Sequence, residues 1–127
     1  MNKQALLRIV GITGLIGIGL GAFGAHGLKD FLEEHGKTIA WNKAVLYHLI
    51  HLVALLALAL GADRLSRKSF ALIAWSWLIG IFLFSGSLYA LSLTNLGIFG
   101  PITPFGGLAF LFGWSILIFT GYREAKV

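Results

Sequence analysis

Four long apolar segments, separated by short polar stretches, dominate the sequence. They extend roughly over residues 5–25, 44–62, 70–91 and 104–122, and each has about the 20 residues that a helix needs to cross the hydrocarbon core of a bilayer. No long linker or compositional break divides the chain, so residues 1–127 are expected to form one membrane domain. The pattern predicts an all-α membrane protein folded as a bundle of four transmembrane helices.

The stretch between the first two segments has a different pattern. One face carries Leu28, Phe31, Leu32 and His35 at helical spacing, and the positions between them are Lys29, Asp30, Glu33 and Glu34. Apolar residues on one side of a helix and charges on the other are typical of a helix that lies on the membrane surface. We therefore expect a short amphipathic surface helix between the first and second spans, ended by Gly36.

Composition supports a membrane environment. Hydrophobic residues make up 57% of the chain and charged residues 12%, and the mean hydropathy is +0.86. A soluble domain of this size cannot bury so much apolar surface in one core, so the lipid bilayer is the expected partner. The formal net charge is +5, but the basic residues lie in short turns rather than on one solvated face, and nucleic acid is not an expected partner.

The first apolar segment has two interpretations. Lys3 and Arg8 give it a basic start, and Ala22-Phe23-Gly24 is a poor cleavage site, so it could be a signal peptide. Its apolar run exceeds the roughly 7–15 residues of a signal-peptide core. We therefore expect a retained transmembrane helix.

The distribution of Lys and Arg predicts the orientation in the membrane. In a four-span protein the N terminus, the turn after the second span and the C terminus share one side, which carries Lys3, Arg8, Arg64, Arg67, Lys68, Arg123 and Lys126. The other side carries Lys29, Lys37 and Lys43. Because cytoplasmic loops are enriched in Lys and Arg, both termini are expected in the cytoplasm.

Small residues recur in the first segment and at the start of the fourth. The candidate packing residues are Gly17, Gly21, Gly24, Ala25, Gly106 and Gly107. Small residues let helix backbones approach closely, so we expect contacts between helices of one chain, with self-association into a homo-oligomer as the alternative. The Gly106–Gly107 pair could instead offer backbone N–H groups to an anion. The run from Gly19 to Gly24 is not interpreted as a nucleotide-binding motif, because no strand precedes it.

Polar side chains concentrate in the expected outer half of the bundle. The candidate pocket consists of His26, Tyr47, His48, His51, Ser85, Tyr89 and Thr103. Tyr47, His48 and His51 share one face of the second helix, and Ser85 and Tyr89 share one face of the third. His26 is expected at the membrane level of His48. The three histidines are therefore predicted to converge on one pocket, with Ser85 and Tyr89 opposite them.

Several chemistries fit histidines inside a membrane protein. Imidazole binds metals and haem in helix bundles, but no carboxylate accompanies the histidines within the apolar segments and the chain has no cysteine, so neither a metal nor a cofactor is expected. Ser85 or Ser87 with His48 would be the only nucleophile–base pair, without an acid to orient the histidine, so an enzyme is not expected. There remains a non-catalytic bundle whose pocket serves binding, assembly or membrane stability. A small transporter or proton-linked carrier that uses the same residues is the alternative.

Four motifs resemble a known family. They are Gly21-Ala22-Phe23-Gly24-Ala25-His26-Gly27-Leu28-Lys29, the stretch from Trp41 to His51, Phe84-Ser85-Gly86-Ser87-Leu88-Tyr89, and Ile102-Thr103-Pro104-Phe105-Gly106-Gly107. Together they are similar to the small membrane family known as domain of unknown function 423, whose eukaryotic relatives are called transmembrane protein 256. The resemblance covers nearly the whole chain and implies a four-span protein of the bacterial inner membrane. It implies no particular activity or ligand.

Overall fold

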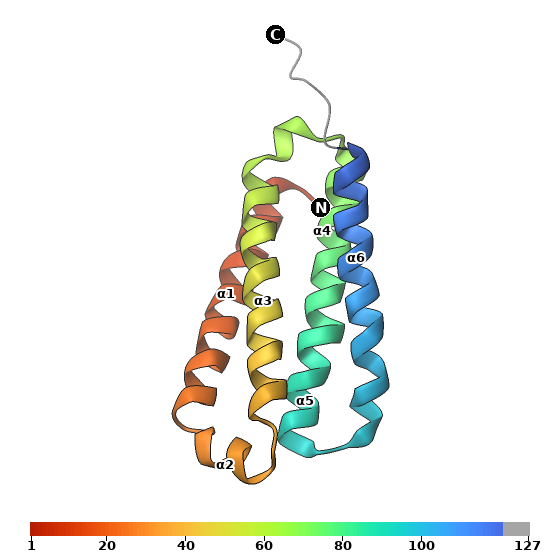
Figure 1. Cartoon of the computed structure of the whole chain (residues 1–127). Helices are drawn as coiled ribbons and strands as arrows, with labels where there is room; N and C mark the ends of the chain where they lie inside the picture. The colour runs from red at the N-terminus through yellow and green to blue at the C-terminus, as the bar shows by residue number, and fades with distance from the viewer. Residues whose placement is uncertain (121–127) are drawn as a thin grey trace.

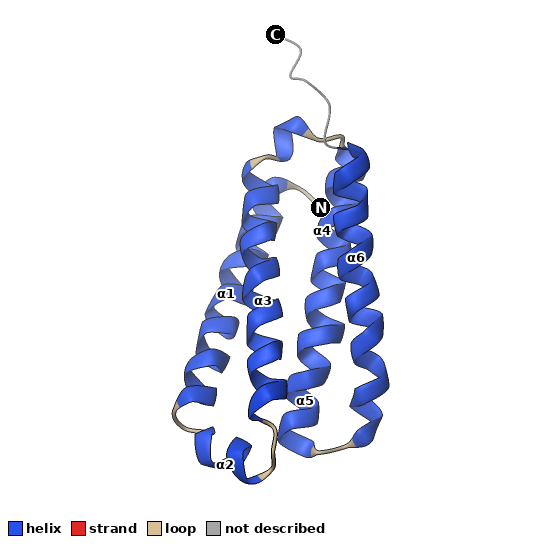
Figure 2. Cartoon of the chain, in the orientation of Figure 1, coloured by secondary structure: helices blue, strands red, loops and turns tan. Residues whose placement is uncertain are grey.

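The computed structural model describes residues 1–120, and every regular element in this range is helical (Figures 1 and 2). The elements are α1 (Lys3–Ala25), α2 (Lys29–Glu34), α3 (Thr38–Leu60), η1 (Ala62–Arg64), α4 (Arg67–Gly80), η2 (Ile81–Ser85), α5 (Gly86–Thr94), η3 (Gly97–Ile102) and α6 (Thr103–Thr120). Four helical stretches are long and apolar enough to cross a membrane. The predicted four-helix membrane bundle with a short surface helix, α2, is confirmed.

Two of the spans differ in length from the apolar segments. α3 begins at Thr38, about six residues before the expected start, because the polar residues 42–43 continue the helix and Trp41 packs its buried indole against α1. The third span runs over 28 residues, Arg67–Thr94. Residues 121–122, which the expected fourth helix includes, lie outside the described residues.

The middle of the third span is a π-helix. η2 connects α4 to α5 without a break, and the N–H of Gly86 donates to the carbonyl of Ile81, five residues earlier. A π-helical turn accommodates one extra residue in the helix and therefore shifts the direction of every side chain that follows. Ser85 and Tyr89 are placed by this shift.

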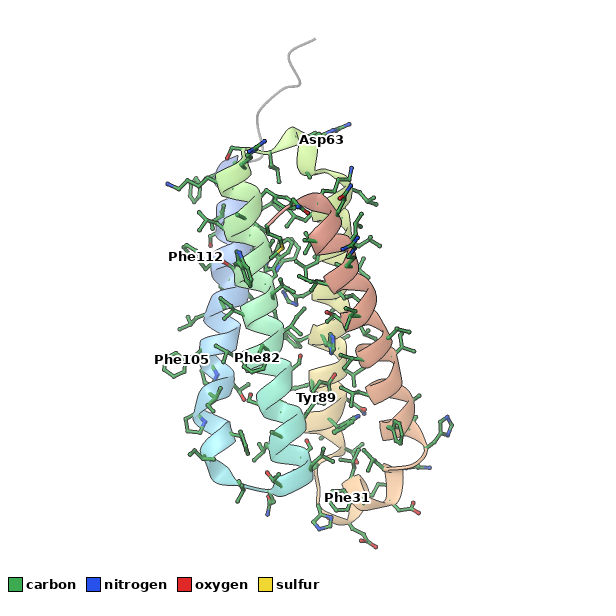
Figure 3. The ribbon with its side chains drawn as sticks, turned by 180° about the vertical axis from the view of Figure 1, so that it is seen from behind. Phe31, Asp63, Phe82, Tyr89, Phe105 and Phe112 are labelled. Carbon is green, nitrogen blue, oxygen red and sulfur yellow. The ribbon has the colours of Figure 1, made fainter. Side chains whose placement is uncertain are left out.

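The two ends of the bundle carry different turns. The N terminus and η1, with Asp63, lie at one end, and α2, with Phe31, lies at the other (Figures 1 and 3). Gly36 after α2 and Asn95 after α5 have positive φ angles of 62° and 54°, a conformation that ends helices. These turns allow four nearly antiparallel helices to cross the bundle in succession.

A ladder of glycines joins α1 to α3. A Cβ on Gly14, Gly17, Gly21 or Gly24 would meet Leu52, Leu49, Val45 or Trp41, respectively, at 3.3 Å or less. The partner on α3 moves back along the chain as the glycine advances, as expected for antiparallel helices in close contact. At the last of these contacts, the Trp41 indole N–H donates to the Leu20 carbonyl at 3.0 Å and so links α3 to α1. Gly17, Gly21 and Gly24 thus lie at a helix contact, whereas Ala25 is exposed.

A second ladder joins the third span to α6. Phe110 lies over Gly80, Trp77 lies over Gly113, and the backbone of Phe84 lies against Gly106. Each helix therefore supplies a large side chain that packs against a glycine of the other helix. Gly107 faces the Phe84 ring at an ordinary 3.9 Å, so it contributes less to the close approach than Gly106.

These ladders divide the bundle into two tightly packed pairs, α1 with α3 and α4–η2 with α6. Contacts of α3 with η2 and α5 hold the pairs together. The seams between α1 and the third span, and between α3 and α6, are packed less closely. The two buried histidines, His48 and His51, lie along these two seams.

Candidate functional site

His48 and Tyr89 form a polar pair in the seam between α1 and the third span. His48 is the eleventh of the 23 residues of α3, so its ring lies near the middle of the span, and it is 3% exposed. Its Nδ1 lies 3.2 Å from the Tyr89 hydroxyl. Tyr89 lies on α5, on the side that faces α1 (Figure 3).

The second ring nitrogen of His48 is unpaired. Nε2 is buried and has no hydrogen-bond partner within the described part of the chain. It faces α1, where a Cβ on Gly17 would lie 3.2 Å away, and the backbone of Thr13 on α1 is also near the ring. A buried polar group without a partner costs about 1–3 kcal/mol. His48 therefore has unused hydrogen-bonding capacity, as does Trp77, whose indole Nε1 is also buried without a partner among the described residues.

A groove opens beside this pair. It has a volume of about 290 Å³ and is lined by Thr13, Ile16 and Leu20 of α1, by Leu78 and Phe82 of the third span, and by His48 and Tyr89. Its walls are mainly apolar, and its polar lining residues are Thr13, His48 and Tyr89. This geometry suits an apolar molecule with one hydrogen-bonding group that enters sideways between the helices.

His51 lies in the other seam and is fully paired. Its Nδ1–H donates to the Tyr47 carbonyl at 2.9 Å, and the Trp114 indole N–H donates to its Nε2 at 3.1 Å. The ring stacks on Phe110, with 3.5 Å between ring centroids. One nitrogen donates and the other accepts, which is the arrangement of a neutral imidazole. His51 thus bridges α3 and α6.

The expectation of one pocket with three histidines is corrected by this geometry. His26 is exposed at the C-terminal cap of α1. In the α1–α3 register it is level with residues near position 40 of α3, about 12 Å from the level of His48 at 1.5 Å per residue. His48 and His51 differ by about 60° around α3 and contact different neighbours. The early start of α3 is the main reason, because it moves His48 away from the end of the bundle.

The hydroxyl groups of the expected pocket are used in contacts between helices. The Ser85 hydroxyl, fully buried, donates to the Ala44 carbonyl at 2.7 Å. The hydroxyls of Ser87 and Thr103 lie 2.6 Å apart and join α5 to α6. Neither serine hydrogen-bonds to a histidine, so the described residues contain no assembled serine–histidine pair. Within residues 1–120, no three His, Cys, Asp or Glu side chains are grouped as metal ligands would be.

Comparison with known proteins places this geometry in a family. Residues 20–107 match the model of the family described as "Protein of unknown function (DUF423)". The chain belongs to this family. The match includes the ladder of α1 from Gly21 onward, both buried histidines, Ser85 and Tyr89. The suspected family is therefore confirmed.

Curated relatives in this family cover nearly the whole chain. It is 44% identical to the UPF0382 membrane protein YwdK of Bacillus subtilis over 84% of its length and 87% of the relative. It is 43% identical to a UPF0382 membrane protein of Haemophilus influenzae over 98% of its length and 99% of the relative. A fission yeast member, UPF0382 membrane protein C1782.12c of Schizosaccharomyces pombe, is 34% identical over 91% of the chain and 99% of the relative. No solved structure matches the chain significantly. The protein is thus a small integral membrane protein of a family without an assigned activity.

The aromatic residues around His51 were not predicted as part of a site. Trp77, Phe110 and Trp114 surround its ring, and Trp114 supplies the hydrogen bond that fixes it. The spacing of Phe110 and Trp114, i and i+4, places both on one face of the fourth helix. That signal is also typical of lipid-facing aromatic residues, so the sequence alone does not distinguish the two roles.

Proposed function

We propose that this family member is a non-catalytic binding protein that takes an uncharged, largely apolar molecule from the bilayer into the groove between α1 and α5. The observation that carries the proposal is the unpaired Nε2 of His48, 3% exposed, beside a groove with apolar walls. The histidine three residues later has both nitrogens paired. The contrast supports a binding role for His48 and a packing role for His51.

The depth of the site limits the polarity of the ligand. A charged group near the middle of a bilayer is costly, so the polar group of the ligand is uncharged. The Tyr89 hydroxyl can donate to His48 or accept from it, and it keeps one further hydrogen-bonding capacity in either case. A ligand hydroxyl or carbonyl that bonds the His48–Tyr89 pair, with its apolar part along Ile16 and Leu78, fits the lining.

Nitrogen NMR of the histidine side chains tests this proposal. Protein labelled with ¹⁵N-histidine in lipid bicelles is titrated with 1-decanol, and decane serves as the apolar control. We expect 1-decanol to shift the His48 ring signals in a saturable way, decane to have a smaller effect, and His51 to remain unchanged. Loss of the effect in Ile16→Trp, which fills the groove, but not in Ile18→Trp, which faces outward, identifies the groove. Equal responses of the two histidines, or no response, would contradict the proposal.

The orientation proposed from the sequence has both termini in the cytoplasm and the protein in a bacterial inner membrane. It is supported by the five basic residues at the end that contains the N terminus and η1, against three at the other end; Arg123 and Lys126 lie outside the described residues. The chain has no cysteine, so single cysteines at Asp63 and Glu34 can be labelled in intact cells with an impermeant thiol reagent. Glu34→Cys should react and Asp63→Cys should not, and the reverse pattern would overturn the orientation.

A small proton-linked carrier remains the second candidate. It would require a chain of polar groups from His48 to the end that contains η1. The Thr13 hydroxyl donates to the Ile9 carbonyl and the Ser76 hydroxyl to the Leu72 carbonyl, so these groups are occupied within their own helices. This arrangement favours binding over transport. Proton flux in proteoliposomes that is lost in His48→Gln would favour the carrier instead.

A further inference from the structure

A second cavity lies at the end of the bundle that contains η1, away from the groove with His48. It has a volume of about 300 Å³ and opens between α3 and α6, which face the same side of the bundle (Figure 1). Ala54, Ala57 and Gly61 provide its wall on α3, and Trp77 and Trp114 provide its wall on the opposite side. Because α6 packs on α4 and η2 rather than on α3, the small residues of α3 face an open space.

Among residues 1–120, the cavity has one charged lining residue, Arg64 of η1. Arg67 and Lys68 follow it at the start of α4, and the acid in η1, Asp63, lies 3.8 Å from Lys3. The end of an apolar, membrane-facing cavity is therefore bordered by a net positive turn. Arginine binds phosphate groups through its planar fork of donors, and basic pockets between transmembrane helices bind anionic headgroups.

We infer that this cavity is a binding site for an anionic phospholipid, with one acyl chain between α3 and α6 and the headgroup phosphate at Arg64. The apolar lining favours a lipid over a free anion as the ligand. A free anion would contact Arg64 and would leave the apolar space beside Trp77 and Trp114 empty. Arg64 lies in η1, just beyond the last residue of α3, a helix long and apolar enough to cross a membrane, so the headgroup level is expected there. The site is separate from the proposed groove and does not depend on it.

Tryptophan quenching by brominated lipids tests the inference, because Trp77 and Trp114 line the cavity. The outward-facing Trp75, which is 52% exposed, is first replaced in a Trp75→Phe background. Protein is reconstituted in phosphatidylcholine bilayers with a small fraction of acyl-brominated phosphatidylglycerol or of acyl-brominated phosphatidylcholine. We expect stronger, saturable quenching by the anionic lipid.

Two matched charge variants distinguish a specific lipid-binding site at Arg64 from general electrostatic attraction of anionic lipid to the basic end of the bundle. Arg64→Gln should lower the affinity for brominated phosphatidylglycerol about five-fold, the ratio that corresponds to ~1 kcal/mol per basic residue at the membrane surface. Arg67→Gln removes the same charge from the same end of the bundle but lies beside a different cavity, with Met1 and Phe70, and should have a smaller effect. Equal losses in the two variants, or equal quenching by both lipids in the parent, would overturn the inference.

A variant of the wall locates the acyl chain. Ala57→Phe fills the cavity without changing the charge, and it should remove the preferential quenching of the parent. If the folded variant keeps the preference, the chain does not lie in this cavity and the inference fails. If this variant does not fold, Ala54→Leu provides a smaller obstruction at the same wall, and the comparison of Arg64→Gln with Arg67→Gln still decides between a site and surface attraction.

Discussion

Replacement of Gly106 with alanine is expected to separate α6 from the third span. A Cβ on Gly106 would lie 2.2 Å from the backbone nitrogen of Phe84 and 2.7 Å from its Cα. Both are backbone atoms in the interior of a transmembrane helix, so no side-chain rotation can relieve the overlap. Gly107 provides a matched control, because its Cβ would meet only the Phe84 ring, at 3.9 Å.

The size of the effect follows from the movement that the new methyl group requires. Restoring an ordinary contact of 3.4 Å from 2.2 Å moves the two helices apart locally by about 1.2 Å. This movement also loosens the neighbouring contacts of Gly80 and Gly113 in the same ladder. Overpacking costs about 1–3 kcal/mol, and the loss of the neighbouring contacts places Gly106→Ala near the upper value. Gly107→Ala is expected within about 0.5 kcal/mol of the parent.

Unfolding by sodium dodecyl sulfate in mixed micelles, followed by circular dichroism, measures these free energies. The two variants have the same composition, so the difference between them reports position alone. A free energy of unfolding of Gly106→Ala equal to that of Gly107→Ala would refute the close contact between α6 and η2.

The same unfolding assay checks three further contacts. Gly24→Leu should destabilise the bundle by about 1–3 kcal/mol through overpacking, while Gly19→Leu, with nothing within 4 Å, should not; similar values would place the α1 contact elsewhere. Trp114→Phe should cost roughly 0.6 kcal/mol, the average for a hydrogen bond between transmembrane helices. An unchanged free energy of unfolding would show that the hydrogen bond from Trp114 to His51 does not stabilise the contact between α3 and α6. Ser85→Ala should cost a similar ~0.6 kcal/mol, and an equal cost for the exposed Ser115→Ala would contradict a special role of Ser85.

The number and order of the spans could be predicted because the length of an apolar run is itself the signal for a transmembrane helix. The start of α3 could not, since residues 38–43 are partly polar and become helical through packing of Trp41 on α1. Contacts of Gly17, Gly21 and Gly24 within the chain follow from their spacing. The roles of Gly80 and Gly113 could not be predicted from spacing, because each depends on which large residue of the opposing helix packs against it.

The composition of the candidate site could be predicted better than its arrangement. His48 and Tyr89 were expected to face one another, and they lie in contact. His51 was assigned to the same pocket because residues at i and i+3 share a face. Sequence spacing describes one helix, however, and the partner of each face depends on how the neighbouring helices pack. Here one side of α3 faces α1 and α5, and the other faces α6.

The different Nδ1 partners of the two buried histidines follow from one serine and the π-helix that places it. His51 donates to the carbonyl four residues before it, that of Tyr47, and the exposed His35 hydrogen-bonds to Phe31 in the same way. The corresponding carbonyl for His48 is that of Ala44, and the Ser85 hydroxyl already donates to it. His48 contacts the Tyr89 hydroxyl instead and keeps one nitrogen unpaired. Because Ser85 is the last residue of η2, the extra residue in the π-helix directs its hydroxyl toward α3, and the Nδ1 of His48 pairs with Tyr89. The difference at Nε2 has another cause: this atom of His51 accepts from Trp114, whereas that of His48 faces Gly17 of α1, which has no side chain to pair with it.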